Sequence, residues 1–385
     1  MKRLLLILLA ASVASVASVA AEEAGFVPLF NGRDLTGWVN VNCAPETWTV
    51  ADGTIHCTGH PTGALRTPRQ YENFILEAEW RHLSSGGNSG LFNWGTPIAA
   101  PGVPFLRGIE VQVLDHGYNA KGKNEWYTTH GDVFPIHGAT MEPFGRHNGM
   151  RSFPSEERSL GSPQWNHYRI VGSNGVLRLS VNGQEVSGGQ NCRYRKGYLA
   201  LESEGAPVEF RHLRIRELPS SGALPEDTAP MDLGWKSLFN GLDLRGWTTN
   251  AATASRWQVT GERLSLRDGT TDPAATLWTV SSFGDAEFIL DVHPPAAVPG
   301  AEMAPLFVQL RGHSQSAGDI PLRGAESGRY QRYTITVRGR DVAVRRGEEA
   351  AVHRTLPAEV PDRGAFGLRA TSGTLEFMNL YARDL

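Results

Sequence analysis

Hydrophobic and polar residues alternate along many short segments of the chain. In GIEVQVL, residues 108–114, three apolar residues alternate with Glu110 and Gln112. A period of two is the pattern of a strand with one buried and one outward side. Similar runs occur at 74–80 (FILEAEW) and 208–218 (VEFRHLRIREL), and Gly, Asn and Asp punctuate the intervening segments. No segment keeps a helical period for three turns, so the pattern predicts an all-β protein.

The chain also contains an internal repeat. LFNGRDLTGW at 29–38 returns as LFNGLDLRGW at 238–247, and later segments match in the same order. Residues 219–235 are rich in Pro and small polar residues, as is typical of a linker. The repeat therefore predicts two β-sandwich or jelly-roll domains in tandem, at 26–218 and 236–385.

The N-terminus and the charge indicate where the protein works. Residues 1–20 combine Lys2 and Arg3 with an apolar run, which predicts a signal peptide and an exported protein, periplasmic or extracellular. No later segment predicts a membrane span. The net charge of -3 gives no reason to expect a nucleic acid or an anionic membrane as partner. In an oxidising compartment, Cys43 and Cys57 are the expected disulfide pair among three cysteines.

The two copies differ in one region. The first copy carries about fifty extra residues there, including the segments 87–95, 108–117 and 124–158. Nine of the twelve histidines also lie in the first copy. Long irregular segments on a rigid sheet are usually functional, because the fold does not need them. We therefore expect the site in the first copy and a degenerate second copy without one.

Several motifs of the first copy occur together in one known family. LFNGRDLTGW, FILEAEWR, GGNSGLF, GIEVQVLD and GYLALESEGAPVEFRHLRIREL resemble, in this order, the 3-keto-disaccharide hydrolase domain family over residues 26–218. The resemblance implies a concanavalin A-like jelly roll. It also implies cleavage of the glycosidic bond in glycosides oxidised at C3, and so an oligosaccharide or glycoside as partner. Fold alone would support none of this chemistry.

A ketone at C3 acidifies the C2 proton, so a base can remove that proton while an acid assists the leaving group at C1. Glu110 is the candidate base, because it lies on the polar side of its strand. Asp115, five positions later, reaches the same side only if a β-bulge intervenes. His116 and His137 are candidate acids, and Arg81 or a bound cation could polarise the ketone oxygen. Water addition would then complete a net hydrolysis.

Other polar and aromatic residues could contact the sugar, since flat aromatic rings stack on sugar faces. Each has a plain structural alternative: an ordinary turn, an ion pair between two neighbours on one strand, or a place in the core. The candidates are Gln112, Asn88, Glu79, Arg81, Trp94, Trp126, Tyr127 and His130, the last also a possible acid.

Two alternative functions and a metal remain open. A non-catalytic carbohydrate-binding protein would use the same groove and aromatics. An ordinary glycosidase would need two carboxylates on the groove strand, and Gln112 occupies the place of the second. Calcium could be held by Asp115, Asp132 and loop carbonyls, whereas the histidine spacing does not favour zinc.

Overall fold

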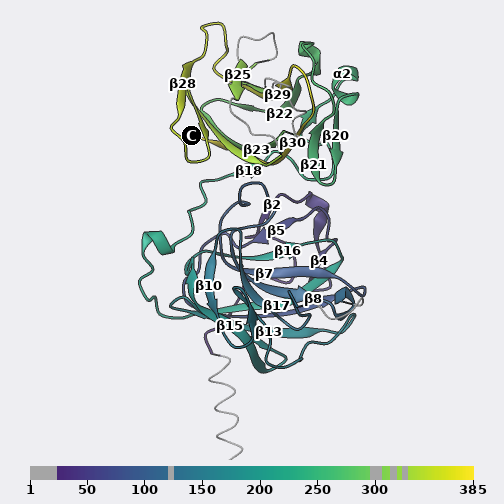
Figure 1. Cartoon of the computed structure of the whole chain (residues 1–385), viewed down its shortest axis with the longest axis vertical. Helices are drawn as coiled ribbons and strands as arrows, with labels where there is room; N and C mark the ends of the chain where they lie inside the picture. Colours follow the sequence, from purple (N-terminus) through teal and green to yellow (C-terminus); the bar gives the residue numbers. More distant parts are fainter. Residues whose placement is uncertain (1–23, 120–124, 295–305, 313–318, 323–327) are drawn as a thin grey trace, which may run out of the picture.

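The computed structural model describes residues 24–119, 125–294, 306–312, 319–322 and 328–385, and the predicted signal peptide lies outside them. Figure 1 shows two β-rich domains, the first from purple to teal and the second from green to yellow. All strand pairs between named strands are antiparallel. Among the described residues, no helix is long and apolar enough to cross a membrane. The predicted all-β fold with two jelly-roll sandwiches is confirmed.

The first domain consists of a large and a small sheet. The large sheet contains, in spatial order, β10 (Thr140–Pro143), β15 (Gln184–Arg193), β14 (Val176–Val181), β13 (Asn166–Ser173), β6 (Phe74–His82), β17 (Val208–Glu217), β4 (Thr54–Cys57) and β3 (Trp48–Ala51), with β1 (Val27–Pro28) beside β17. The small sheet contains β11 (His147–Asn148), β12 (Arg151–Ser152), β9 (Val133–Ile136), β8 (Gly108–Leu114), β7 (Asn88–Gly95), β16 (Tyr198–Ser203), β5 (Gly63–Arg66) and β2 (Val39–Val41).

Alternation along β8 decides which residues enter the core between these two sheets. Ile109, Val111 and Val113 are fully buried in the core cluster. Glu110 and Gln112 lie on the opposite side of the strand and line a pocket on the outer face of the small sheet. The strand therefore has the two faces that its pattern predicts, a core face and a polar face.

The second domain has the same plan. Its large sheet contains β20 (Trp257–Thr260), β21 (Arg263–Leu266), β30 (Leu375–Asp384), β23 (Ala286–His293), β26 (Gln331–Arg338), β27 (Asp341–Arg346) and β28 (Val352–Thr355), with β18 (Lys236–Ser237) beside β30. Its small sheet contains β19 (Trp247–Thr248), β22 (Leu277–Phe283), β29 (Gly364–Ala370), β24 (Leu306–Gln309) and β25 (Asp319–Leu322). The short helices are η1 (Pro45–Thr47), η2 (His116–Asn119), η3 (Pro225–Asp227), α2 (Ala251–Ala254) and η4 (Pro273–Ala275).

The strand order of the second domain repeats that of the first. The series β3, β4, β17, β6, β13, β14 and β15 corresponds to β20, β21, β30, β23, β26, β27 and β28. The small sheets correspond in the same way up to β8 and β25. Strands β9, β11 and β12 extend the first small sheet. They all lie within residues 124–158 of the first copy, which we call the extra segment. The extra segment thus enlarges the sheet beside β8.

The repeated LFNG motif forms the same turn in both domains. Asn31 accepts hydrogen bonds from the backbone of the second and third residues after it and donates to Asp34. Asn240 and Asp243 make the equivalent bonds. Asn and Asp favour such turns because their side chains bond to nearby backbone groups. The motif therefore has a structural role in this chain.

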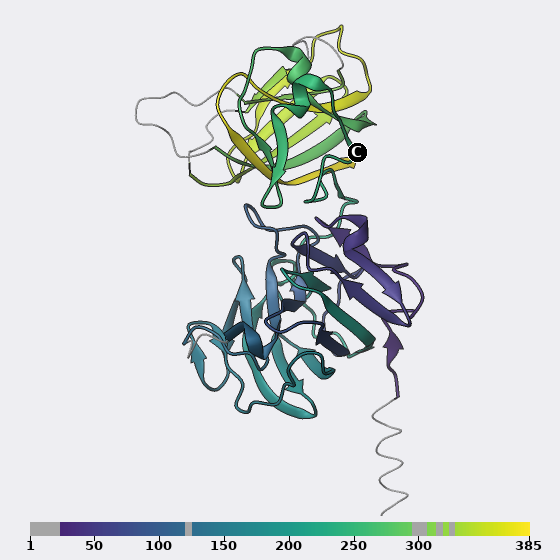
Figure 2. The same ribbon diagram turned by 90° about the vertical axis from the view of Figure 1, so that its right-hand side faces the viewer.

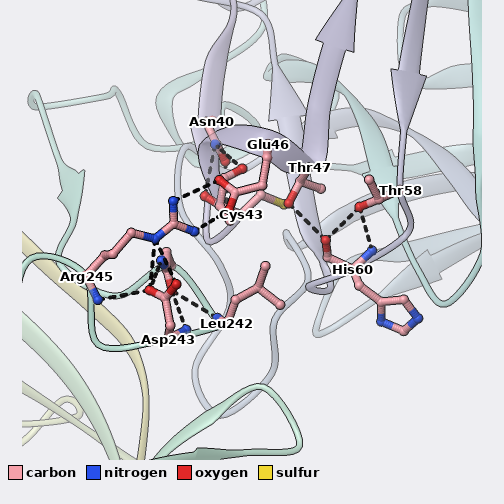
Figure 3. A network of polar contacts seen from close by, with 11 residues as sticks. Asn40, Cys43, Glu46, Thr47, Thr58, His60, Leu242, Asp243 and Arg245 are labelled. Carbon is pink, nitrogen blue, oxygen red and sulfur yellow. Dashed lines mark hydrogen bonds and ion pairs between the residues drawn. The ribbon is translucent and has the colours of Figure 1, made fainter.

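The two domains contact one another directly. Figure 3 shows Arg245 of the second domain reaching Glu46 of the first, with 3.2 Å between Nη1 and Oε2. A second view shows the segment near residue 100 extending from the first domain toward the second (Figure 2). This segment joins β7 to β8, so the part of the first domain that faces the second domain is next to β8, the strand that carries Glu110 and Gln112.

The expected disulfide is absent. Cys43, Cys57 and Cys192 are all buried free thiols. Cys43 and Cys57 do lie in one core cluster, but each behaves as a small apolar residue there, a common role for buried cysteine.

Candidate active site

The candidate site is a pocket of about 280 Å³ on the outer face of the small sheet of the first domain. Strands β7, β8, β9 and β16 form its floor, and the extra segment contributes the wall. Its lining residues are Asn88, Phe105, Glu110, Gln112, Leu114, Tyr118, Tyr127, Phe134, Ile136, His137, Arg151, Glu202 and Glu204.

A larger hollow of about 540 Å³ lies on the outer face of the large sheet. Its two carboxylates, Glu77 and Glu79, are both engaged by arginines. Carboxylates that are paired with arginines in this way stabilise the sheet and are less available to act as an acid or a base. We therefore place the candidate site in the smaller pocket, where carboxyl groups lack such partners.

Glu110 and Glu202 approach each other over Gly90. Oε1 of Glu110 and Oε2 of Glu202 are each 2.8 Å from the position that a Cβ on Gly90 would occupy. Strand β7, which carries Gly90, runs between β8 and β16, so the two carboxyl groups come from strands on either side. Only the missing side chain of glycine leaves this space open.

Both carboxyl groups are buried, with Glu110 6 % exposed and Glu202 1 % exposed. Burial raises the pKa of Glu110 to about 8, and the nearby Glu204 adds to this effect. Burial, followed by repulsion from Glu110, raises the pKa of Glu202 well above its usual range. Oε2 of Glu202 has no hydrogen-bond partner among the described residues. Protonated or strongly basic carboxyl groups at neutral pH are typical of acid–base catalysis.

A chain of hydrogen bonds surrounds this pair. Asn88 donates to Glu204 and accepts from Gln112, with 2.8 Å between Gln112 Nε2 and Asn88 Oδ1. Arg151 Nη1 donates to Gln112 Oε1 at 3.3 Å and to the fully buried Asp132 at 3.1 Å. The network fixes two amides and one guanidinium at the pocket surface, where polar ligand atoms can meet them.

Aromatic residues form the walls of the pocket. The rings of Tyr118 and Tyr127 meet edge to face, with centroids 5.7 Å apart. Phe105 stacks on His137 with centroids 5.5 Å apart, and burial lowers the pKa of His137. A pocket with aromatic walls and a few convergent polar groups fits a sugar ring, which has apolar faces and hydroxyl edges.

Of the predicted site residues, Glu110, Gln112, Asn88, His137 and Tyr127 line this pocket. The structure brings them together from two strands and the extra segment. Their roles in catalysis and binding stay predictions, but their convergence in one pocket is what the alternation and the location of the extra segment led us to expect.

Asp115, His116 and His130 do not line the pocket, which corrects their expected placement. Both oxygens of Asp115 accept backbone N–H groups, from Gly86 and Gly117 on one oxygen and from Ser162 on the other. These bonds lower the pKa of Asp115 against the effect of its burial. The carboxylate therefore ties loops together at the end of β8, and no bulge turns it into the pocket.

The rings of His116 and His130 lie against each other, with centroids 4.6 Å apart. Each has a ring nitrogen 2.9 Å from the Ser159 hydroxyl. Ser159 also donates to the carbonyl of Thr129, so these contacts link η2, which follows β8, to the loop that contains Thr129 and His130.

Four further candidates also lie away from the pocket. Glu79 pairs with Arg211 on the large sheet, and Arg81 pairs with Glu209, Nε to Oε2 at 2.6 Å. The Trp94 ring is fully buried in the core. Trp126 is 74 % exposed and does not line the pocket.

Sequence reasoning missed Glu202, Glu204, Arg151, Tyr118 and Phe105. The pair Glu202 and Glu204 had a usable signal, because in YLALESE the two carboxylates alternate with neutral residues as Glu110 and Gln112 do. Arg151 had none, since it lies on a two-residue strand that only the tertiary structure places beside Gln112.

The expected calcium site is not found among the described residues. Within the described part of the chain, no group of three or more His, Cys, Asp and Glu is arranged to hold a metal ion. Asp115 and Asp132, the expected calcium ligands, are occupied by backbone N–H groups and by Thr128 and Arg151.

Comparison with known proteins supports a carbohydrate-active class. Residues 25–216 match the model of the 3-keto-alpha-glucoside-1,2-lyase-like domain family. The first domain belongs to this family, which is the one its motifs resemble, and it is therefore a carbohydrate-active domain. No curated protein sequence matches the chain.

Among solved structures, the chain is similar to a "putative glycosyl hydrolase" from Parabacteroides distasonis, with 22% identity, TM-score 0.40, and 51% of this chain and 95% of that chain covered. It is also similar to carbohydrate binding module CBM66 from Bacillus subtilis, with 12% identity, TM-score 0.35, and coverage of 47% and 96%. A Bacillus subtilis protein of unknown function with a galectin-like fold has 10% identity, TM-score 0.35, and coverage of 50% and 94%.

Proposed function

We propose that the first domain cleaves 3-keto-glycosides by eliminating the group on C1 across the C1–C2 bond. The observation that carries this proposal is the pair of buried carboxyl groups, Glu110 and Glu202, over Gly90. Membership of the lyase-like family supports the choice of a C3-oxidised substrate. The base, the acid and the electrophile that such an elimination needs are all available in the pocket.

Glu110 is the proposed base. It removes the C2 proton, and the adjacent C3 ketone delocalises the negative charge onto its oxygen. A pKa raised to about 8 makes this carboxylate a stronger base than an ordinary one, while a usable fraction remains ionised near neutral pH. Arg151 is the proposed electrophile: its guanidinium lies at the pocket surface and can stabilise the enolate oxygen.

Glu202 is the proposed acid. The enolate electrons form a C1–C2 double bond as the C1–O bond breaks, and the departing oxygen takes the proton of Glu202. The products are an alcohol and a 1,2-unsaturated 3-keto sugar, and addition of water across the double bond gives net hydrolysis. Glu202 suits this role because its raised pKa keeps it protonated. His137 is less available as a donor because its lowered pKa leaves it neutral.

The pocket favours a short substrate. Its volume of about 280 Å³ lies just below the range of typical small-molecule sites, ~300–1,000 Å³. Tyr127 and Tyr118 offer aromatic surface for a sugar face, and Asn88 and Gln112 offer amide groups for hydroxyls. A disaccharide or a small glycoside fits this description better than a long polysaccharide chain.

The test is incubation of the full chain with a chemically 3-oxidised disaccharide and, in parallel, with the unoxidised sugar. We expect cleavage of the oxidised sugar alone, with transient near-ultraviolet absorbance from the conjugated enone. In D₂O the hydrated product should carry deuterium at C2, beyond that in an enzyme-free control. Cleavage that retains the C2 proton would contradict the elimination.

The alternatives give different results in the same experiment. An ordinary glycosidase would cleave the unoxidised disaccharide as well. A carbohydrate-binding protein would bind the sugar, as calorimetry can detect, and cleave neither form. The buried Oε2 of Glu202, which has no hydrogen-bond partner among the described residues, argues against binding alone, because an unpaired buried polar atom is costly without a function.

We also propose that the enzyme acts outside the cytoplasm, on the strength of the N-terminal pattern at 1–20. Cell fractionation with antibody detection tests this. Recovery of full-length protein in the cytoplasmic fraction alone would contradict it.

A further inference from the structure

Beside the pocket, the outer face of the small sheet is covered by two elements. One is the segment 96–107, which connects β7 to β8, and the other is the second domain. Phe92, Ala64 and Ala200 of the sheet pack in one apolar cluster with Ile289 and Tyr381 of the second domain. The same cluster includes Leu106, with Phe105 packed against it. The second domain therefore closes one end of the face on which the pocket lies.

Polar groups of the second domain bind the backbone of this segment directly. Asn379 Nδ2 donates to the carbonyls of Ala100 at 3.1 Å and Val103 at 2.8 Å. The amide N–H of Gly102 donates to Asp291 at 2.8 Å, and this carboxylate is fully buried.

Two more bonds involve Ala99. Its carbonyl accepts from Arg332 at 2.9 Å, and its N–H donates to the Tyr381 hydroxyl at 3.2 Å. Five hydrogen bonds thus hold residues 99–103 to the second domain, and the segment has few ways to move while they persist.

The held segment leads into the pocket wall. Phe105 follows Val103 by two residues and stacks on His137 inside the pocket. Two further features join the domains near this segment. Glu262 of the second domain accepts a hydrogen bond from the N–H of Thr62 at 2.9 Å. Pro104 of the segment and Asn379 of the second domain line one small cavity between the domains. The position of Phe105 therefore depends on contacts that the first domain does not make alone.

We infer that the second domain sets the substrate specificity of the first, by closing one end of the sheet face and holding the Phe105 wall so that the pocket accepts a terminal sugar. This inference rests on the proposed function for the identity of the sugar. Asn379 is the central positioning residue, because its single amide binds two carbonyls of the segment and Asp291. None of the described residues of the second domain lines this pocket, so the second domain acts on it through the segment 96–107.

The geometry supplies a clean variant. Asn379 has φ of 51° at a bulge of β30, a conformation that glycine adopts without strain. Asn379→Gly removes the amide and keeps the backbone. His212→Gly is the matched control, since His212 has φ of 52° at the corresponding bulge of β17 and pairs with Glu79 on the large sheet. Tyr381→Phe is a milder second variant that removes one hydrogen bond.

In Asn379→Gly we expect the amides of Ala99, Ala100, Gly102 and Val103 to exchange with deuterium at least ~10-fold faster, because a local opening is made easier. We also expect KM for the 3-keto-disaccharide to rise ~10-fold or more with kcat changed less than about twofold, since the wall positions the sugar without touching the proton transfers. Tyr381→Phe should change both quantities in the same direction by less. His212→Gly should change neither.

Unchanged exchange at 99–103 in Asn379→Gly would overturn the inference, and so would faster exchange with an unchanged KM. Should the wild-type chain not cleave the oxidised sugar, the proposed function fails while this inference is still tested. The exchange measurement needs no substrate, and the dissociation constant of the unoxidised disaccharide, measured by calorimetry, then replaces KM. A dissociation constant that is equal in the wild type and in Asn379→Gly would overturn the inference.

Discussion

At the scale of single residues, the proposed chemistry centres on two carboxyl groups that share one small space. Glu110 and Glu202 reach it from two strands, and Gly90 between them has no side chain to fill it. Burial and the charge of Glu110 raise the pKa of Glu202, so the titration of Glu202 depends on the protonation of Glu110. Removing one of them should therefore affect both rate and titration.

Glu110→Gln should lower kcat by ~100-fold or more, the usual scale for loss of a general base. The amide keeps the shape of the side chain, so KM should change little. The measurement is steady-state cleavage of the 3-keto-disaccharide. Glu209→Gln is the matched control, because Glu209 is equally buried but pairs with Arg81 and His56 on the large sheet. Equal turnover by Glu110→Gln and wild type would move the base to another group.

The stability of the protein should depend on pH through the same residue. The pKa of Glu110 is raised from 4.5 to about 8 in the folded state, so the folded chain holds this proton more tightly than the unfolded chain does. The free energy of unfolding should therefore fall as the pH rises from about 4.5 to about 8. Denaturant titrations at pH 5 and pH 9 should show a smaller loss in Glu110→Gln than in the wild type. The same loss in both proteins would contradict the raised pKa.

At the scale of elements, strand order decides which side chains can meet. Strand β7 lies between β8 and β16, which brings Glu110 close to Glu202 although they are far apart in the chain. The same bulge occurs in β17 and β30, with His212 and Asn379 at matching positions. In the first domain His212 pairs with Glu79, whereas in the second domain Asn379 binds the segment that joins β7 to β8. A conserved local geometry thus carries two different contacts.

Gly90→Ala tests the role of β7. The new methyl group would lie 2.8 Å from an oxygen of Glu110 and of Glu202, so at least one carboxyl must move. We expect kcat to fall ~100-fold, because small displacements of reacting groups are costly. The melting temperature should change little if the carboxyls move into the open pocket. Gly284→Ala controls for loss of a glycine, because its backbone is not left-handed and an added Cβ makes only ordinary van der Waals contacts, at 3.6 and 3.7 Å. Full activity in Gly90→Ala would contradict the proposed site.

At the scale of the whole molecule, the apolar contact between the domains should make them unfold together. Ile289 and Tyr381 of the second domain are buried against Phe92 and Ala200 of the first, and burying such side chains contributes ~1.5–3 kcal/mol each. Calorimetry of the wild type should show one transition. Ile289→Asp places a charge in this contact, which is unfavourable, and should give two.

Val352→Asp is the control for that substitution, since Val352 is 58 % exposed on β28 and should leave a single transition. Two transitions in the wild type would show that the domains unfold independently. Such a result would also weaken the coupling of Asn379 to the pocket.

Local patterns in the sequence determined much of this protein. Alternation assigned Ile109, Val111 and Val113 to the core and Glu110 and Gln112 to the outer face, because side chains of a strand alternate between its two sides whatever the strand's neighbours are. The internal repeat predicted two similar domains, and the strand orders agree with it.

Only the tertiary structure decided the composition of the pocket. Glu202 and Arg151 come to Glu110 and Gln112 through pairing between distant strands, which one sequence does not specify. Asp115 was misplaced because, besides Gly117 of its own turn, backbone N–H groups of two distant loops bind it at Gly86 and Ser162, and those loops meet it only in the folded chain. The contacts of Asn379 with the β7–β8 segment likewise arise from domain packing, so a pattern within either copy cannot contain them.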